Sequence, residues 1–186
     1  YLKGLKDRGN VQVVVMDLSE TYRTIARRYF PNAMIVADRF HVVRLINQHF
    51  LKVWQQVHPE GRKHRGLLSL MRRHQWHLRD EQHANLMAYL ADYPVLQALY
   101  TAKQELVRFM LLKTVTAKRM KAKLPRYLDL LEQLRHSPLR ALAKTLASWM
   151  EPVLAMWRFS KTNGITEGFH NKMEMISRRA YGFRNF

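Results

Sequence analysis

The chain has 186 residues, of which 47% are hydrophobic, which is enough for one sizeable domain with a core and argues against wholesale disorder. Lys and Arg number 32 against 14 Asp and Glu, so the formal net charge is +18, and nucleic acid is the commonest partner for such a charge. The absence of cysteine excludes disulfides and thiolate zinc sites, and it is compatible with a cytoplasmic location. The sequence contains no apolar run of membrane-spanning length, so no membrane partner is expected.

The first forty residues contain two short apolar segments that predict buried strands, at 11–16 and 33–37, with helical spacing between them at 18–30. Strand, helix and strand in this order predict a βαβ unit with parallel strands, and hence an α/β fold. An aspartate follows each strand, Asp17 and Asp38. Functional groups collect at the carboxyl ends of parallel strands, but capping of the next helix explains either aspartate equally well, and Ser19 is a second candidate cap.

From Val42 to about Ser160 the strand signals disappear, and apolar residues recur at three- and four-residue spacings that predict helices. Pro152 is expected to kink or divide the last helix, and Pro125 could split the one before it. The fold class is therefore mostly helical around a small α/β part. The predicted helices cover 40–57, 64–78, 80–92, 95–113, 116–135 and 138–158.

The tail predicts one more helix, over about 165–180, with Glu167 in its first turn. A glutamate there is favoured by the helix dipole, which is a purely structural reason for its presence. The alternative is that Glu167 meets Asp17 in a site. The residues alone do not decide between these interpretations.

Three strings carry a resemblance to a known family. The segment 163–172, N-G-I-T-E-G-F-H-N-K, together with 177–185, S-R-R-A-Y-G-F-R-N, resembles the terminal motif of bacterial insertion-sequence transposases of the ISL-three family. The segment 15–20, V-M-D-L-S-E, resembles the family's second-aspartate segment, and 38–43, D-R-F-H-V-V, resembles its D-x-x-H motif. The strings occur in the family's order, so the resemblance covers essentially the whole chain.

The resemblance implies a ribonuclease-H-like catalytic domain that cuts and joins DNA with two Mg²⁺ or Mn²⁺ ions. Asp17 would be the second catalytic aspartate and Glu167 the glutamate, while the first aspartate is expected on a strand before Tyr1. Two hard cations over one phosphate require oxygen ligands, which explains the carboxylates. His41 is expected near the catalytic centre, with packing at the first turn of the helix that begins near Arg39 as the alternative, and Asp38 is expected to cap that helix. The chain alone is expected to be inactive.

The resemblance further implies a division into a first part of the ribonuclease-H-like core (1–41), an all-helical insertion (42–160) and a terminal catalytic helix (161–186). The expected partners are DNA, at transposon ends and targets, and a second copy of the protein, with no small-molecule cofactor. The expected location is the bacterial cytoplasm, with nucleoid association when the protein is bound to DNA.

Basic side chains near the Glu167 helix and in the helical region are expected to contact DNA phosphates, with a solvated helical face as the alternative for each. Trp149 and Trp157 could stack on a DNA base, but core packing is preferred for both and is the only interpretation for the other aromatic residues of the insertion. Two other kinds of protein remain open, a non-catalytic DNA-binding module and an oligomerisation domain. The candidate DNA contacts are Lys172, Arg178, Arg179, Arg184, Arg62, Lys63, Arg65, Arg72 and Arg73.

Overall fold

A computed structural model describes residues 4 and 6–159 of the chain. Over these residues the chain is mostly helical and carries one small parallel sheet, as the sequence predicts. The elements are η2 (Arg8–Asn10), β1 (Val13–Met16), α1 (Glu20–Tyr29), β2 (Met34–Ala37), α2 (Arg39–Val57), α3 (Pro59–Lys63), α4 (Arg65–Arg72), η3 (Gln75–His77), α5 (Asp80–Ala91), α6 (Pro94–Leu111), α7 (Ala117–Gln133), α8 (Ser137–Ser148) and α9 (Met150–Arg158).

The predicted βαβ unit is confirmed. β1 and β2 pair in parallel with Val13 opposite Met34 and Met16 opposite Ala37, and α1 connects them. Ser19 is the residue that caps α1, since its hydroxyl accepts a hydrogen bond from the Tyr22 amide. Asp17 is thereby left without a capping role.

The two strands differ in burial. Val36 and Ala37 of β2 are fully buried, but all four residues of β1 are only half-buried, so the prediction of a buried first strand is wrong. The physical reason is coverage: α9 packs closely on β2, whereas β1 has only a few contacts with α1 and pairs with β2 alone among the described residues.

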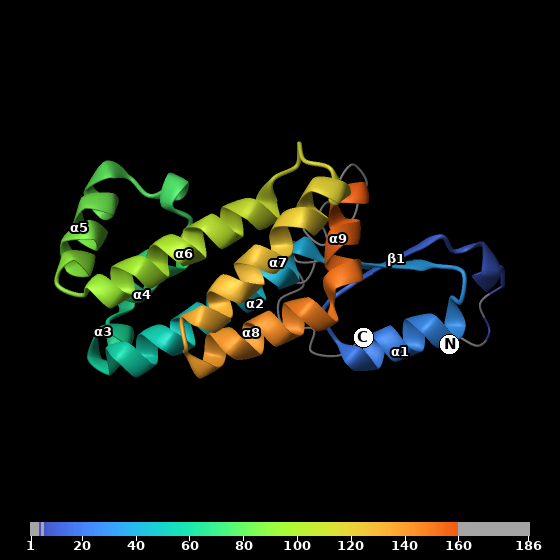
Figure 1. Ribbon diagram of the computed structural model, residues 1–186, viewed down its shortest axis with the longest axis horizontal. Coiled ribbons are helices and arrows are strands. Elements are labelled where there is room, and N and C mark those ends of the chain that lie inside the picture. Colours follow the sequence, from blue (N-terminus) through green and yellow to red (C-terminus); the bar gives the residue numbers. More distant parts are fainter. Residues whose placement is uncertain (1–3, 5, 160–186) are drawn as a thin grey trace, which may run out of the picture.

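The helices form an elongated body that extends away from the sheet (Figure 1). α2 lies centrally and packs against α6 and α8, while α7 packs on α8 and α9. α9 lies between the sheet and the long helices, and α3, α4 and α5 form the end of the molecule farthest from α1 (Figure 1). One hydrophobic cluster runs from Val36 in the sheet through Ile46 and Trp54 of α2 to Met110 of α6, so the sheet and the helices share a core.

Two predicted helices are divided differently from the sequence-based expectation. The helix expected over 64–78 ends at Arg72, because Arg73 adopts an extended backbone, and only the short η3 follows. The last helix is divided at Trp149 and not at Pro152. Pro152 is the third residue of α9, where a missing N–H removes no helical hydrogen bond. Pro125 lies on the exposed side of α7 and does not split it.

Over the described part of the chain, no helix has both the length and the apolar character needed to cross a membrane.

Candidate functional site

The parallel register brings the two candidate aspartates to one edge of the sheet. Met16 and Ala37 are paired at the ends of their strands, and the Asp38 amide donates a hydrogen bond to the Met16 carbonyl at 2.6 Å. Asp17 and Asp38 therefore leave the sheet side by side at its carboxyl edge. This is the position where loops of an α/β sheet surround an open crevice.

Asp38 caps α2, as the sequence predicts. Its Oδ1 accepts a hydrogen bond from the Phe40 amide at 2.8 Å, which satisfies a backbone donor that the first turn of the helix cannot. Its Oδ2 lies 3.4 Å from Nδ1 of His41, one helical turn along. Asp38 thus anchors the start of α2 and lies beside the imidazole of His41, whose side chain is about one-third exposed (35%) and whose Nδ1 has no hydrogen-bond partner among the described residues.

Asp17 is in a different situation. Its side chain is half-buried, and Oδ1 is shielded from solvent without a hydrogen-bond partner among the described residues. Buried carboxylate oxygens are almost always hydrogen-bonded, so an atom in this state is suited to binding a cation or a donor that the described residues do not supply.

The remaining carboxylate of the predicted site, Glu167, lies outside the described residues. So do the four basic residues predicted beside it, Lys172, Arg178, Arg179 and Arg184. Within residues 4 and 6–159, no three His, Asp or Glu side chains lie close enough together to hold a metal ion. Of the two predicted metal ligands, Asp17 alone lies among the described residues.

The basic residues predicted in the helical region lie on α3, on α4 and just after it. Lys63, Arg65, Arg72 and Arg73 are exposed, and Lys63 pairs with Glu60 at 2.8 Å. Arg62 differs, because it is half-buried and its guanidinium lies 5.9 Å from the centre of the Trp54 ring. The side chain of Arg62 therefore packs partly against Trp54 and is less available to solvent than the other four.

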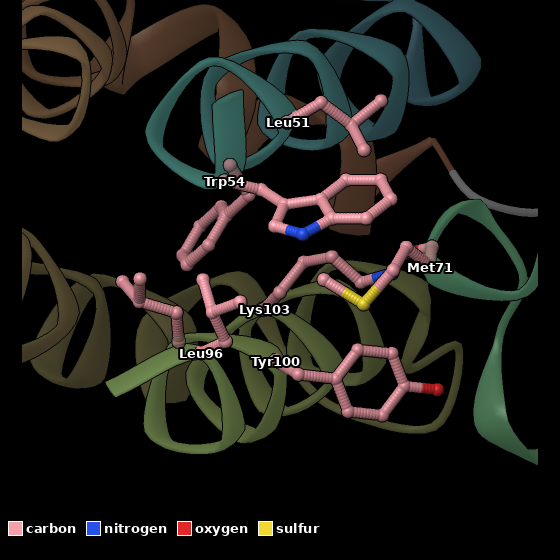
Figure 2. A pocket seen from close by; sticks show the side chains of 8 residues that line it. Leu51, Trp54, Met71, Leu96, Tyr100 and Lys103 are labelled. Atoms are coloured by element: carbon pink, nitrogen blue, oxygen red, sulfur yellow. The ribbon is translucent and has the colours of Figure 1, made fainter. Parts of the chain in front are cut away.

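A buried lysine joins this basic segment to α6 (Figure 2). Lys103 is only 2% exposed and extends between Trp54, Met71 and Tyr100, with which it lines a small cavity. Its Nζ donates hydrogen bonds to the carbonyl oxygens of Met71 and Arg73, at the end of α4. Burial lowers the pKa of Lys103 from 10.5 to about 7, because the charged form loses its hydration.

The segment that follows α4 carries a stacked pair of aromatic rings, His74 and Trp76. The ring of Trp76 in η3 stacks on His74 with the ring centres 4.8 Å apart and the planes 5° from parallel. Burial, and then the nearby charges of Lys103 and His77, lower the pKa of His74 from its ordinary value.

Of the aromatic residues expected in the core, Trp149 and Trp157 are confirmed there. Trp149 is 1% exposed beneath the Arg23 guanidinium, and Trp157 donates from Nε1 to the Leu112 carbonyl at 2.7 Å. The core interpretation is wrong for Trp76, which is 48% exposed. The surrounding basic residues were the one signal in the sequence that could have marked it as a surface aromatic.

The structure contains a basic groove that the sequence-based analysis did not predict. It lies beside the first half of β2, away from the edge that carries Asp17, and one carboxylate, Glu151, is among its lining residues. Glu151 is 3.8 Å from Nζ of Lys121. The basic side chains come from α1, α7 and α9, so no local pattern in the sequence could show that they meet. They are Arg27, Lys118, Lys121 and Arg158.

Comparison with known proteins agrees with the strings in the sequence. The sequence model of the ISL3 (ISL-three) family of DDE proteins, described as Transposase, matches residues 1–186. A curated protein from Bordetella parapertussis, the transposase for insertion sequence element IS1001, is 25% identical over 183 residues, which cover 94% of this chain. The chain spans only 45% of the length of that relative. No solved structure matches the chain.

Proposed function

Since the chain belongs to the ISL-three family of DDE transposases, we propose that it supplies part of a catalytic domain for metal-dependent DNA strand cleavage and strand transfer at transposon ends. The observation that carries the proposal is the state of Asp17: a carboxylate at the carboxyl edge of a parallel strand, with one buried oxygen that no described group satisfies. The β1–α1–β2 unit would be part of a ribonuclease-H-like core, together with the tail.

Under this proposal the chain has three parts: the first part of the core at 1–41, a helical insertion at 42–160 and a terminal catalytic helix at 161–186. The described residues support this division in one respect, since both strands precede residue 42 and helices follow. The shared hydrophobic cluster would make the insertion a rigid extension of the core.

Asp17 and Glu167 would hold divalent metal ions, Mg²⁺ or Mn²⁺, with a further aspartate from a strand that precedes Tyr1. A buried, unpartnered carboxylate oxygen fits a hard cation of this kind. When bound, such ions activate an attacking oxygen and stabilise the leaving one.

The other residues at the edge would position groups. Asp38 anchors the start of α2 through the Phe40 amide, and it would orient the His41 imidazole through the charge of Oδ2, which lies 3.4 Å from Nδ1. His41 would then present its other ring nitrogen, Nε2, toward the scissile phosphate or toward a ligating carboxylate, as either donor or acceptor.

DNA would be held chiefly through its phosphates. Lys63, Arg65, Arg72 and Arg73 are exposed, and with Lys172, Arg178, Arg179 and Arg184 of the tail they would position the duplex without reading its sequence. Self-association also belongs to the proposal, because β1 pairs with β2 alone among the described residues and its other edge can pair with a strand from elsewhere.

The decisive experiment compares Asp17→Asn and Glu167→Gln with a matched control, Asp129→Asn on the exposed side of α7, in the complete protein. Both test variants should lower Mg²⁺-dependent strand cleavage on the order of 10³-fold, because metal-ligand charge stabilisation amounts to several kcal/mol. DNA affinity should change little. Asp129 has no place in the proposed site, so Asp129→Asn should cleave within a few-fold of wild type, as expected for an exposed substitution.

Cleavage by Asp17→Asn at the wild-type rate would reject the catalytic assignment and favour a non-catalytic DNA-binding module. Equal losses in Asp17→Asn and Asp129→Asn would show that the loss does not depend on the edge of the sheet, and would likewise reject the catalytic assignment.

A further inference from the structure

Trp76 presents a large aromatic surface that the core does not use. The side chain is 48% exposed, although the other described tryptophans, Trp54, Trp149 and Trp157, are each at most 5% exposed. It lines an open groove together with the polar side chains of Thr101, Glu105 and Arg108 on α6. Leu111 and Leu112 continue the groove at the end of that helix.

The aromatic surface is held rigidly. His74 lies parallel to Trp76 at 4.8 Å and backs the indole. The backbone of the turn is fixed from α6 by buried Gln104, whose Oε1 accepts from the Gln75 amide at 3.1 Å and whose Nε2 donates to the Arg73 carbonyl at 3.0 Å. Lys103 binds the same Arg73 carbonyl at 3.4 Å. The ring is thus preorganised, so a ligand that stacks on it would lose little further side-chain entropy.

The charge around the ring favours a polyanion. No Asp or Glu occurs from Gly61 through Arg79, and Arg72, Arg73 and Arg79 in this stretch are exposed. Arg73 donates to the Gln82 side chain at 3.3 Å, which leaves its charge uncompensated by any described carboxylate. Arg108 adds a positive charge inside the groove, and Glu105 a negative one.

We propose that the stacked His74–Trp76 pair and its surrounding arginines form a binding site for an unpaired nucleotide of single-stranded DNA. The base stacks on the indole in the groove, and the adjoining phosphates contact Arg72, Arg79 and Arg108. This inference deepens the proposed function, on which it rests for the identity of the polymer as DNA. It places the contact beside the second half of α6, which runs from the α5 end of the helical body toward α7 (Figure 1).

The chemistry selects an unpaired strand over a duplex. Every base offers a flat π-face, but in a duplex both faces are covered by neighbouring base pairs, so an aromatic side chain can stack only on a base that has left the helix or lies at an end. Basic residues alone would contact a duplex just as well. The exposed, backed ring is the feature that a duplex-binding surface does not require.

The test measures the affinity of the chain for three fluorescent oligonucleotides at one fixed salt concentration. The first is a blunt duplex, the second carries a short unpaired thymidine overhang, and the third carries an overhang of abasic residues with the same number of phosphates. The abasic overhang separates stacking from charge. The protein variants are wild type, Trp76→Leu and Trp76→Phe, with Tyr22→Leu as a control for loss of an exposed aromatic on α1 at the opposite end of the molecule.

Wild type and Tyr22→Leu should bind the thymidine overhang more tightly than the abasic one, roughly 5- to 150-fold, the range that stacking of a single base supports. Trp76→Leu should bind both overhangs equally, and Trp76→Phe should retain most of the preference. Thermal unfolding of each variant confirms that the fold is kept, as expected for an exposed side chain.

Equal binding of the two overhangs by wild type, or a preference that survives in Trp76→Leu, overturns the inference. Failure of the proposed function appears differently, as absence of binding to the blunt duplex while the thymidine preference persists. Absence of binding to all three oligonucleotides overturns both.

Discussion

Lys103 of α6 shows how a single residue can connect the basic stretch at residues 62–73 to the buried core. Its amine donates to two carbonyl groups at the end of α4, that of Met71 and that of Arg73, which also accepts from Gln104 Nε2. Burial makes the charged form expensive, which is why its pKa falls to about 7. The neutral amine still has two N–H groups to donate, so both contacts survive deprotonation.

This pKa predicts a pH dependence of stability. Between pH 7 and the ordinary lysine value of 10.5, the unfolded chain holds a proton on Lys103 that the folded chain has released, so the free energy of unfolding rises with pH. The rise should be about 2 kcal/mol between about pH 7.5 and 9.5, and urea unfolding measures it. Above that window Tyr100, whose pKa burial raises to about 12, contributes the opposite slope, since the unfolded chain loses its phenol proton first.

Lys103→Met should flatten the profile, whereas Lys113→Met, at an exposed position, should leave it unchanged. A wild-type profile as flat as that of Lys103→Met over this window would contradict the assignment of a neutral buried amine.

Gly61 provides a second residue-scale test. A Cβ at this position would lie 2.4 Å from Nδ1 of His58 and 2.6 Å from the Tyr89 hydroxyl, which are themselves hydrogen-bonded at 2.8 Å. Gly61→Ala should therefore destabilise the fold by about 1–3 kcal/mol, despite the better helix propensity of alanine. Gly66→Ala, on the exposed side of α4 beside a His64 ring that can move, should be within about 1 kcal/mol of wild type. Chemical denaturation compares the free energies of unfolding of the two variants. Equal values would show that the His58 and Tyr89 side chains can move away from the added methyl group at little cost.

At the scale of elements, the cap of α2 positions the candidate site. Asp38→Ala removes the acceptor of the Phe40 amide and should cost about 1 kcal/mol of unfolding free energy, while Asp38→Asn should cost only a few tenths. The same pair of variants separates the two roles of Asp38, because Asn keeps the helix cap but removes the charge beside His41. A loss in Asp38→Asn as large as in Asp38→Ala would mean that the charge, through His41, matters more than the cap.

The elements that the sequence predicts correctly are those whose cause is local. β1, α1 and β2 follow from apolar runs and caps, and α5, α6 and α7 from apolar periodicity, so their positions were predictable to within a few residues. α4 ends early for a non-local reason: side chains of Lys103 and Gln104 on α6 bind the carbonyl groups that a longer helix would have used itself. The exposure of Trp76 follows from the same contacts.

The candidate site was predictable only in part, and for the same reason. The sequence placed Asp17 and Asp38 at strand ends, and parallel pairing then required them to lie at one edge. It could not assign the cap of α1 to Ser19 over Asp17, since both residue types are good N-caps and the apolar spacing does not fix the first helical residue. Nor could it show the groove of Arg27, Lys118, Lys121 and Arg158, which exists only after α7 and α9 have packed near β2.

At the scale of the whole molecule, the net charge of +18 predicts strongly salt-dependent DNA binding. Each phosphate contact contributes a slope of about −0.9 to the logarithm of affinity against the logarithm of salt concentration, and roughly six to ten contacts would cost about 10³- to 10⁵-fold between about 50 and 200 mM salt. Filter binding across a salt series measures this slope.

The basic groove beside β2 can be tested in the same series. Lys118→Ala should reduce the slope by about one if that groove carries DNA, and Lys113→Ala serves as an exposed lysine outside the groove. A slope that Lys118→Ala leaves at the wild-type value would remove the groove from the DNA path.

The docking of α9 on β2 has a consequence for how the molecule is made. Arg39 is the first residue of α2 and follows β2 closely in the chain. Its guanidinium donates a hydrogen bond to the carbonyl of Met156 in α9, 117 residues later. During synthesis the apolar face of β2 is complete long before its cover exists, and closing so large a loop delays the contact further. The apolar face of β2 therefore stays uncovered while the helices form. During this interval, chaperone binding or aggregation would compete with correct folding.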